Sequence, residues 1–175
     1  GVDEATAEDV AATRRDAGGE LWVANLNAPG QIVVAGGSDD IAWVAENGRD
    51  LGVRRAIPLK VAGAFHSPYM ETAADELTAA LSATHFAPPR FPIYANATAA
   101  PVGDVATNLG EQLVNPVRFA ATLEAMAAAG VDTFVHVGPG DVTAGMVKRT
   151  VPDVRVLVVS VLDDIPPVAE ALNVQ

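Results

Sequence analysis

The first sixty residues alternate between helix-like and strand-like patterns of apolar positions. Residues 3–17 are polar and alanine-rich, with acidic residues early, two arginines late and two glycines directly after them. Acidic residues near the start and basic residues near the end favour a helix dipole, so we expect a helix there. The other elements expected are strands 20–26 and 31–35 around a Pro-Gly turn, a helix over 39–51 that Ser38 caps, and a strand over 53–61.

The order of these elements predicts the fold of the first part of the chain. Helix, strand, strand, helix, strand is the order of a βαββαβ ferredoxin-like unit without its first strand. In that topology the first strand lies inside the sheet, and a gap there leaves backbone groups unpaired. We therefore interpret residues 1–60 as an incomplete ferredoxin-like small subdomain that needs preceding residues, covalently attached or not.

Longer helices alternate with apolar runs in the rest of the chain. Ser67 and Pro68 fit the N-cap and first turn of a helix over 67–83, in which apolar residues recur at helical spacing. Residues 154–162 are apolar on both faces, which is typical of a buried parallel strand, and residues 61–175 are therefore α/β in class. Further elements expected are strands 91–95 and 133–137 and helices over 104–113, from Asn115-Pro116 to Gly130, and over 141–149.

Composition narrows the class of protein. Half of the 175 residues are apolar and 19% are charged, as in a folded globular protein. We find no apolar run of the roughly 18 residues that span a bilayer and no signal-peptide pattern, so we expect a cytoplasmic protein without a membrane partner. A formal net charge of −11 argues against nucleic-acid binding, which needs a surplus of basic residues.

Cysteine and histidine usage bears on the chemistry. The chain has no cysteine, which excludes disulfides and a thiolate nucleophile. Its three histidines, at positions 66, 85 and 136, do not have the spacing of metal ligands, so we expect no metal.

The segment that points most directly to chemistry runs from Lys60 to Met70. An apolar stretch, which we expect to be a strand, leads there into His66 and then into a helix start. The carboxyl ends of strands are where open α/β sheets place their chemistry, and imidazole exchanges a proton near neutral pH. A lone histidine on an apolar segment is more often a packed residue, so the neighbouring motif decides between the two interpretations.

Three segments together carry a family resemblance. The stretch Gly63-Ala-Phe-His-Ser-Pro-Tyr-Met70, with Gln112-Leu-Val-Asn-Pro-Val-Arg-Phe119 and Val137-Gly-Pro-Gly140, resembles the malonyl-CoA:acyl carrier protein transacylase family and the related acyltransferase domains of polyketide synthases. Tyr69 stands where that family commonly has leucine. The resemblance implies that residues 61–175 are the C-terminal part of a large α/β-hydrolase-like parallel-sheet subdomain.

The resemblance assigns roles to two residues. It implies that His66 is the general base for a serine nucleophile, taking the hydroxyl proton and returning it later. It also implies that a main-chain carbonyl oxygen near Gln112 accepts the Nδ1 proton of that histidine and fixes its tautomer, in place of a triad carboxylate. The alternative for the second motif is a plain helix start at Asn115-Pro116, and the two roles can coexist.

The nucleophile is not found in this sequence. The family carries its serine in an upstream Gly-His-Ser-x-Gly elbow, and no Gly-x-Ser-x-Gly occurs in the 175 residues. Ser38 lies in the nearest look-alike, which lacks the second glycine. The family's oxyanion-hole glutamine and malonyl-binding arginine also lie upstream. We therefore expect this chain to pair with the N-terminal half of the same enzyme.

Five further residues match positions of interest in the family. Asn25 and, more weakly, Gln31 match a segment that lines the substrate cleft, although an asparagine before Pro-Gly is usually a turn residue. Phe65 is bulky where methylmalonyl-selective relatives usually carry serine, which implies a preference for malonyl groups. Arg54 and Arg55 either contact the acidic acyl carrier protein or simply solvate an exposed strand start.

The remaining glycine-rich turn and the other two histidines indicate no catalytic or binding role. Gly138-Pro-Gly140 lacks the lysine and the spacing of a phosphate loop, so we interpret it as structural, and we assign no role to His85 or His136.

The reaction implied is ping-pong transfer of a malonyl group from malonyl-CoA to acyl carrier protein for fatty acid biosynthesis, with no cofactor, since CoA and phosphopantetheine thioesters are substrates. Two alternatives remain, an acyltransferase fragment of a polyketide synthase and a noncatalytic fragment without a nucleophile.

Overall fold

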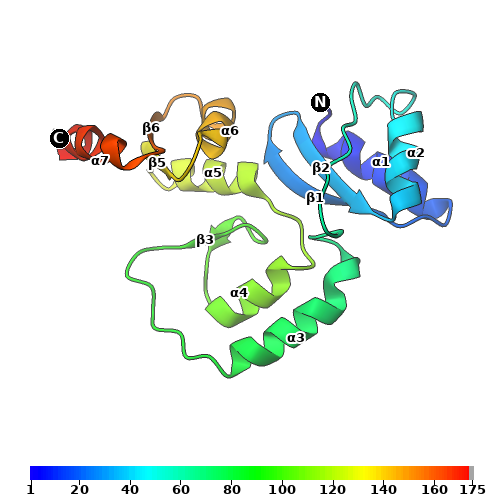
Figure 1. Ribbon diagram of the computed structural model, residues 1–175, viewed down its shortest axis with the longest axis horizontal. Helices are drawn as coiled ribbons and strands as arrows, with labels where there is room; N and C mark the ends of the chain where they lie inside the picture. Colours follow the sequence, from blue (N-terminus) through cyan, green and yellow to red (C-terminus); the bar gives the residue numbers. More distant parts are fainter. Residues whose placement is uncertain (174–175) are drawn as a thin grey trace. The chain divides into compact units, whose positions relative to one another are not determined.

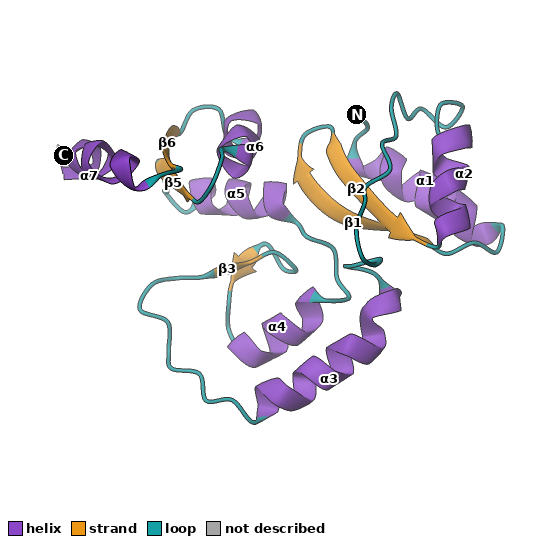
Figure 2. Cartoon of the chain, viewed as in Figure 1, coloured by secondary structure: helices purple, strands orange, loops and turns teal. Residues whose placement is uncertain are grey.

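The protein has a mixed α/β fold with small sheets, described for residues 1–173 by a computed structural model (Figure 1, Figure 2). It divides into two compact units, residues 1–122 and 123–175. In the described part, no helix is both long and apolar enough to cross a membrane. The predicted subdomain boundary near residue 60 stays a prediction.

The first unit begins with a helix packed on a hairpin. Helix α1 spans Glu4–Asp16, and strands β1 (Leu21–Ala28) and β2 (Gln31–Gly36) pair antiparallel before helix α2, Ser38–Asn47. These four elements confirm the predicted order helix, strand, strand, helix. Their buried core joins side chains of α1, β1 and α2, namely Val10, Ala11, Leu21 and Val44.

Helix α2 differs from its predicted form at both ends. The predicted cap at Ser38 is wrong, because Gly37 is the N-cap residue and no side chain caps the helix. The main-chain oxygen of Gly37 instead accepts from the N–H groups of Asp40 and Ile41, at 3.0 and 2.9 Å. The helix ends at Asn47, and Gly52, at φ 87°, lies in the turn that follows rather than at the helix end.

The predicted strand over 53–61 is wrong. Residues 53–61 run as a loop. A strand needs a neighbour to pair its backbone groups, and no strand of the described chain pairs with this segment. Val53 still packs against the core, whereas Ile57, Leu59 and Val61 are 58–67% exposed. The apolar residues that suggested a strand therefore lie mostly in solvent in this chain.

A third segment joins the hairpin at β1. Val117 lies beside Asn25 in an isolated parallel bridge, and its main-chain groups bond to Ala24 and Leu26 at 2.8 Å each. This pairing explains why the predicted helix start at Asn115-Pro116 is wrong. Because the backbone of Val117 is extended against β1, helix α5 begins only at Phe119 and runs to Ala128.

The rest of the first unit follows His66. A 3₁₀ turn η1 (Pro68–Met70) leads into helix α3 (Glu71–Ser82), which packs on helix α4 (Val105–Gln112). These elements confirm the main part of the helix predicted over 67–83 and the helix predicted over 104–113. The strand predicted over 91–95 is reduced to β3 (Tyr94–Ala95), paired with β4 (Ala100–Pro101).

The second unit contains a parallel strand pair. Strands β5 (Thr133–Val137) and β6 (Arg155–Val159) run parallel, and the helix between them, α6 (Val142–Thr150), packs on both. The prediction of strand, helix and parallel strand is confirmed. Strand β6 is shorter than predicted, and the prediction that it is buried is wrong, because none of its residues is fully buried and Val161 and Leu162 beyond it are exposed. The turn η2 (Leu162–Asp164) and helix α7 (Ile165–Asn173) end the described chain.

Candidate functional site

His66 sits in an unusual backbone conformation. The strand expected before it is wrong, because residues 61–65 are turn and loop. The φ angle of His66 is +61°, in the left-handed region that non-glycine residues rarely adopt and that surrounding contacts must maintain. One such contact is the bond from its main-chain N–H to the main-chain oxygen of Leu113, at 3.0 Å.

The imidazole ring is held by the end of helix α4. Nδ1 of His66 lies 2.9 Å from the main-chain oxygen of Gln112, the last residue of that helix. The final carbonyl groups of a helix have no partner within the helix, so the end of α4 offers acceptors for both the ring and the backbone of His66. The end of α4 thus holds His66 through its main-chain oxygens, although Gln112 lies 46 positions further along the chain.

The distances indicate which tautomer of His66 this contact favours. A carbonyl oxygen can only accept, so Nδ1 must carry the proton to bond to it. The side-chain nitrogen of Gln112 is 3.4 Å from the same Nδ1, a poorer contact that would require the opposite tautomer. The shorter contact to the main-chain oxygen therefore leaves Nε2 with a free lone pair, as a general base needs.

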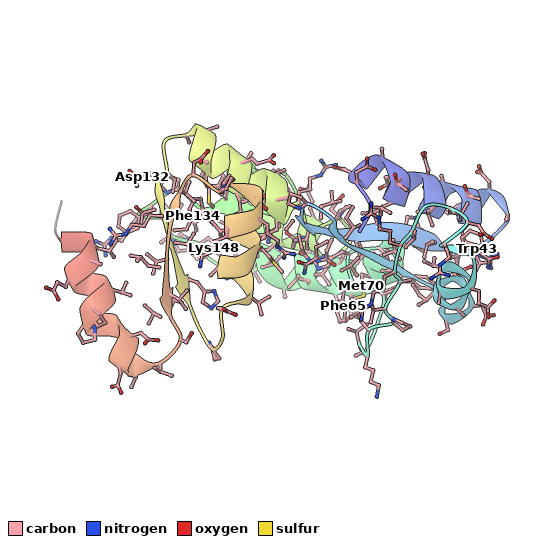
Figure 3. All side chains as sticks on the ribbon, turned by 90° about the horizontal axis from the view of Figure 1, so that it is seen from above. Trp43, Phe65, Met70, Asp132, Phe134 and Lys148 are labelled. Carbon is pink, nitrogen blue, oxygen red and sulfur yellow. The ribbon has the colours of Figure 1, made fainter. Side chains whose placement is uncertain are left out.

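The residues beside His66 differ sharply in exposure. Ser67 is 1% exposed, and its hydroxyl donates to the main-chain oxygen of Ala64 at 2.5 Å. Phe65 is 46% exposed on the preceding turn, and Met70 closes the 3₁₀ turn that follows (Figure 3). The hydroxyl of the buried serine holds the backbone of the turn, whereas the phenylalanine side chain is partly exposed.

Asn25 is tied to the segment that holds the imidazole. It lies at a bulge of β1, opposite Val33, and pairs with Val117, five residues after Gln112. One short stretch of chain thus contacts both the histidine and the strand of the predicted substrate residue. Gln31 lies at the other end of the hairpin register, opposite Ala28 next to the turn.

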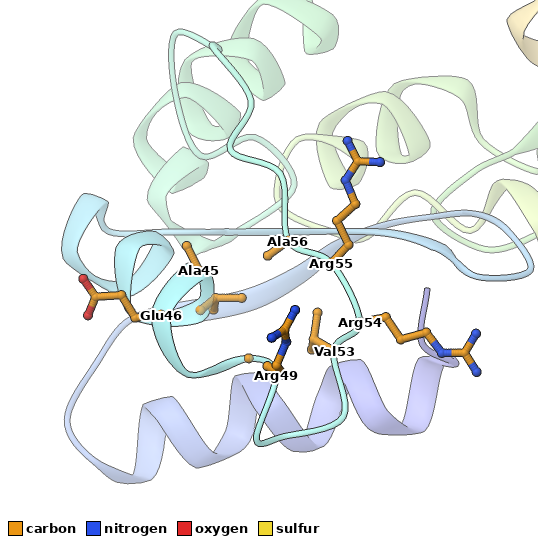
Figure 4. A pocket seen from close by; sticks show the side chains of 9 residues that line it. Ala45, Glu46, Arg49, Val53, Arg54, Arg55 and Ala56 are labelled. Atoms are coloured by element: carbon orange, nitrogen blue, oxygen red, sulfur yellow. The ribbon is translucent and has the colours of Figure 1, made fainter.

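Arg54 and Arg55 line a surface pocket of about 400 Å³ together with a third arginine, Arg49 (Figure 4). Glu46 is the acidic residue of this lining. Arg49 was not predicted, although its position just after the second helix and before the arginine pair was a usable signal. The side chains of Arg54 and Arg55 extend in different directions in Figure 4, so what the three arginines share is a local positive charge, which can attract an anionic partner to an otherwise acidic chain.

The other two histidines lie elsewhere. His136, in the second unit, contacts the hydroxyl of Thr143 through Nδ1, and its Nε2 is 3.2 Å from the main-chain oxygen of Gly138. These bonds brace the Gly138-Pro-Gly140 turn, as a structural interpretation expects. His85 is exposed in the loop after α3.

A family model described as an acyl transferase domain matches residues 2–168. The malonyl CoA-acyl carrier protein transacylase of Bacillus subtilis is 36% identical over 163 residues, which cover 91% of this chain and 51% of the relative. The chain thus spans about half the length of the curated relatives it matches.

Two solved structures are similar to the whole described fold. The acyl-carrier-protein-S-malonyltransferase of Bartonella henselae superposes with a TM-score of 0.92 at 30% identity, covering 99% of this chain and 56% of the other. A malonyl-transacylase solved in complex with its type II PKS acyl-carrier protein gives a TM-score of 0.92 at 29% identity, covering 98% and 56%.

Proposed function

This chain belongs to the acyl transferase domain family, and we propose that it provides the general-base half of an enzyme that moves a malonyl group from malonyl-CoA to the phosphopantetheine thiol of acyl carrier protein. The observation that supports this most strongly is the 2.9 Å contact between Nδ1 of His66 and the main-chain oxygen of Gln112. It leaves Nε2 free to exchange protons with a nucleophile.

The first half-reaction makes an acyl-enzyme. A serine hydroxyl, supplied from outside these 175 residues, loses its proton to Nε2 of His66 while its oxygen attacks the malonyl thioester carbonyl. The tetrahedral intermediate then expels the CoA sulfur, which takes the proton from the imidazolium. The main-chain oxygen of Gln112 stabilises that imidazolium, because it already accepts the Nδ1 proton.

The second half-reaction reverses these roles. The phosphopantetheine thiol of the carrier protein gives its proton to Nε2 of His66, and the thiolate attacks the ester carbonyl of the acyl-enzyme. The serine oxygen leaves with the proton, so the enzyme returns to its starting state. Each half-reaction uses the same histidine once as base and once as acid, with no metal or redox cofactor required.

Substrate contacts are assigned to the residues around this histidine. Phe65, exposed beside the base, favours malonyl over the bulkier methylmalonyl group, and Asn25 lines the acyl cleft with a weaker contribution from Gln31. Packing against one methyl group discriminates by about 1–3 kcal/mol, so we expect a preference rather than full exclusion.

Carrier docking is assigned to Arg54 and Arg55, with Arg49 in the same pocket lining. The relative solved with its acyl-carrier protein supports a partner of this kind. The pathway is fatty acid or polyketide synthesis. In domain terms, residues 1–60 belong to a ferredoxin-like small subdomain and residues 61–175 to a larger α/β-hydrolase-like one that contains the serine.

Transfer assays on the enzyme formed by this chain together with its serine-bearing segment test the proposal. Labelled malonyl-CoA should yield malonyl-carrier protein, and methylmalonyl-CoA should react more slowly. Phe65→Ser should narrow the ratio of the two kcat/KM values by about 10-fold or more. Absence of transfer with a folded enzyme and a phosphopantetheinylated carrier would contradict the proposal and favour the noncatalytic alternative.

A further inference from the structure

The strained turn at His66 needs support from both sides. On one side, the ring and the backbone of His66 bond to the end of helix α4, through the main-chain oxygens of Gln112 and Leu113. On the other side the chain passes through buried Ser67 and Pro68, whose ring fixes its own φ angle. The next residue, Tyr69, is therefore closely coupled in position to His66.

The side chain of Tyr69 reaches the start of strand β1. Its ring packs edge-on against Trp22, with centroids 5.7 Å apart and planes at 86°. Its hydroxyl donates a hydrogen bond to the carboxylate of Glu20. That bond is the main cause that raises the pKa of Tyr69 above its ordinary value, so the phenol keeps the proton it donates.

The backbone of Glu20 is held by two hydrogen bonds, while its carboxylate meets Tyr69 at the exposed surface. Its N–H donates to Oδ2 of Asp40 at 3.0 Å, and its main-chain oxygen accepts from the N–H of Gly37 at 3.0 Å. Asp40 is buried and bonds through Oδ1 to Nε of Arg14 at 2.6 Å. The acceptor of the tyrosine is thus linked to both α1 and α2.

We propose that Tyr69 is a positioning residue, which holds the turn carrying His66 against the start of β1 by donating to Glu20. Strand β1 also carries Asn25, so the link sets the general base in register with the strand assigned to the acyl cleft. The proposal deepens the proposed function and rests on it for its kinetic consequence. Leucine at this position could fill the space beside Trp22 but has no hydroxyl to donate.

Kinetics on the enzyme assembled with its serine-bearing segment test this role. Tyr69→Phe removes only the hydroxyl, and we expect kcat for malonyl transfer to fall about 3- to 10-fold while the KM for malonyl-CoA stays within about twofold. Glu20→Gln keeps an acceptor oxygen and should retain most of the activity. Tyr94→Phe, on strand β3, is the matched control and should lose less than about twofold.

A double variant distinguishes the loss of this one hydrogen bond from a general loss of stability, because the two single losses in kcat should then not add. Glu20→Ala removes the acceptor from the other side, and should lower kcat as Tyr69→Phe does. The double variant should be no slower than the slower single variant, because both changes remove the same hydrogen bond. Values of kcat within twofold of wild type for both single variants, or losses that simply multiply in the double variant, would overturn the proposal.

NMR spectroscopy tests the link between Tyr69 and Glu20 independently of enzyme activity. The ¹⁵N spectrum of His66 should show protonated Nδ1 in the neutral wild-type ring, and Tyr69→Phe should add a second tautomer or speed exchange of the Nδ1 proton. An unchanged His66 spectrum would overturn the positioning role. If the wild-type enzyme transfers no malonyl group, the proposed function is wrong. The spectrum still shows whether the hydrogen bond between Tyr69 and Glu20 positions His66.

Discussion

Nδ1 of His66 lies 2.9 Å from the main-chain oxygen of Gln112, at the last residue of helix α4. In the proposed mechanism this helix terminus takes the place of the carboxylate of a Ser-His-Asp triad, because it accepts the Nδ1 proton and leaves the Nε2 lone pair free.

Loss of the His66 imidazole should abolish most of the transfer activity. For His66→Gln we expect kcat to fall about 10²- to 10⁴-fold, the usual contribution of a general acid-base group. The matched control is His85→Gln, a change at an exposed histidine, which should stay within twofold of wild type. Steady-state transfer rates measure both. A loss below tenfold for His66→Gln would exclude it as the general base.

The side chain of Gln112 should matter much less than its backbone. The close contact to His66 is made by the main-chain oxygen, which any residue supplies, whereas the side-chain nitrogen is 3.4 Å away. We therefore expect Gln112→Ala to lower kcat by less than about tenfold, far less than His66→Gln. Equal losses in the two variants would show that the amide side chain, and not the helix terminus, orients the ring.

Charge reversal in the pocket that Arg54 and Arg55 line should weaken the binding of acyl carrier protein without affecting malonyl-CoA. Replacing Arg54 and Arg55 by glutamate should raise the KM for acyl carrier protein about 10-fold or more at low salt, with acylation by malonyl-CoA unchanged. The effect should shrink at high ionic strength, which screens exposed charges. Arg49→Glu should raise this KM further, and Arg90→Glu, at an exposed arginine that does not line the pocket, is the control. An unchanged carrier KM would rule out docking at this pocket.

Acid should remove the stabilisation that Asp40 provides. The bond from the Glu20 N–H, followed by the Arg14 guanidinium, lowers the pKa of Asp40 below its ordinary value. Because the folded-state pKa is lowered, the stabilisation is full above the ordinary aspartate pKa of about 3.9 and is lost as pH falls through the folded value. Asp40→Asn should therefore lower the Tm at pH 7, and the difference in Tm from wild type should begin to narrow as the pH falls below about 4.

The control for this titration is Asp75→Asn, at an exposed position on helix α3. It should leave the Tm nearly unchanged at both pH values. A gap between wild type and Asp40→Asn that stays constant from pH 7 to pH 3 would contradict the assignment, since the effect would then not depend on the carboxylate charge.

Local patterns predicted the helices and the hairpin because their partners are close in sequence. Strands β1 and β2 pair across a two-residue turn, and α1 carries its cap at Asp3, so short-range rules suffice for both. The strand prediction for residues 53–61 was wrong for the opposite reason. Their β-favouring composition cannot form a strand without a neighbour, and pairing is not a local property.

The site was predicted in part, through its motifs. The sequence pointed to His66 and to a main-chain acceptor near Gln112, and the structure brings those groups together. It did not reveal the left-handed conformation of His66 or the bridge between Asn25 and Val117, which depend on long-range contacts. Glu20 and Tyr69, 49 residues apart, were likewise outside the reach of spacing arguments.

The most direct test of the account is the intact mass of the enzyme formed by this chain and its serine-bearing segment, before and after brief exposure to malonyl-CoA. We predict a gain of one malonyl group, and proteolytic mapping should place it on a serine outside these 175 residues. The His66→Gln variant should gain it far more slowly. A malonyl group on a residue of this chain, such as Ser38, or none on a folded enzyme, would contradict the account.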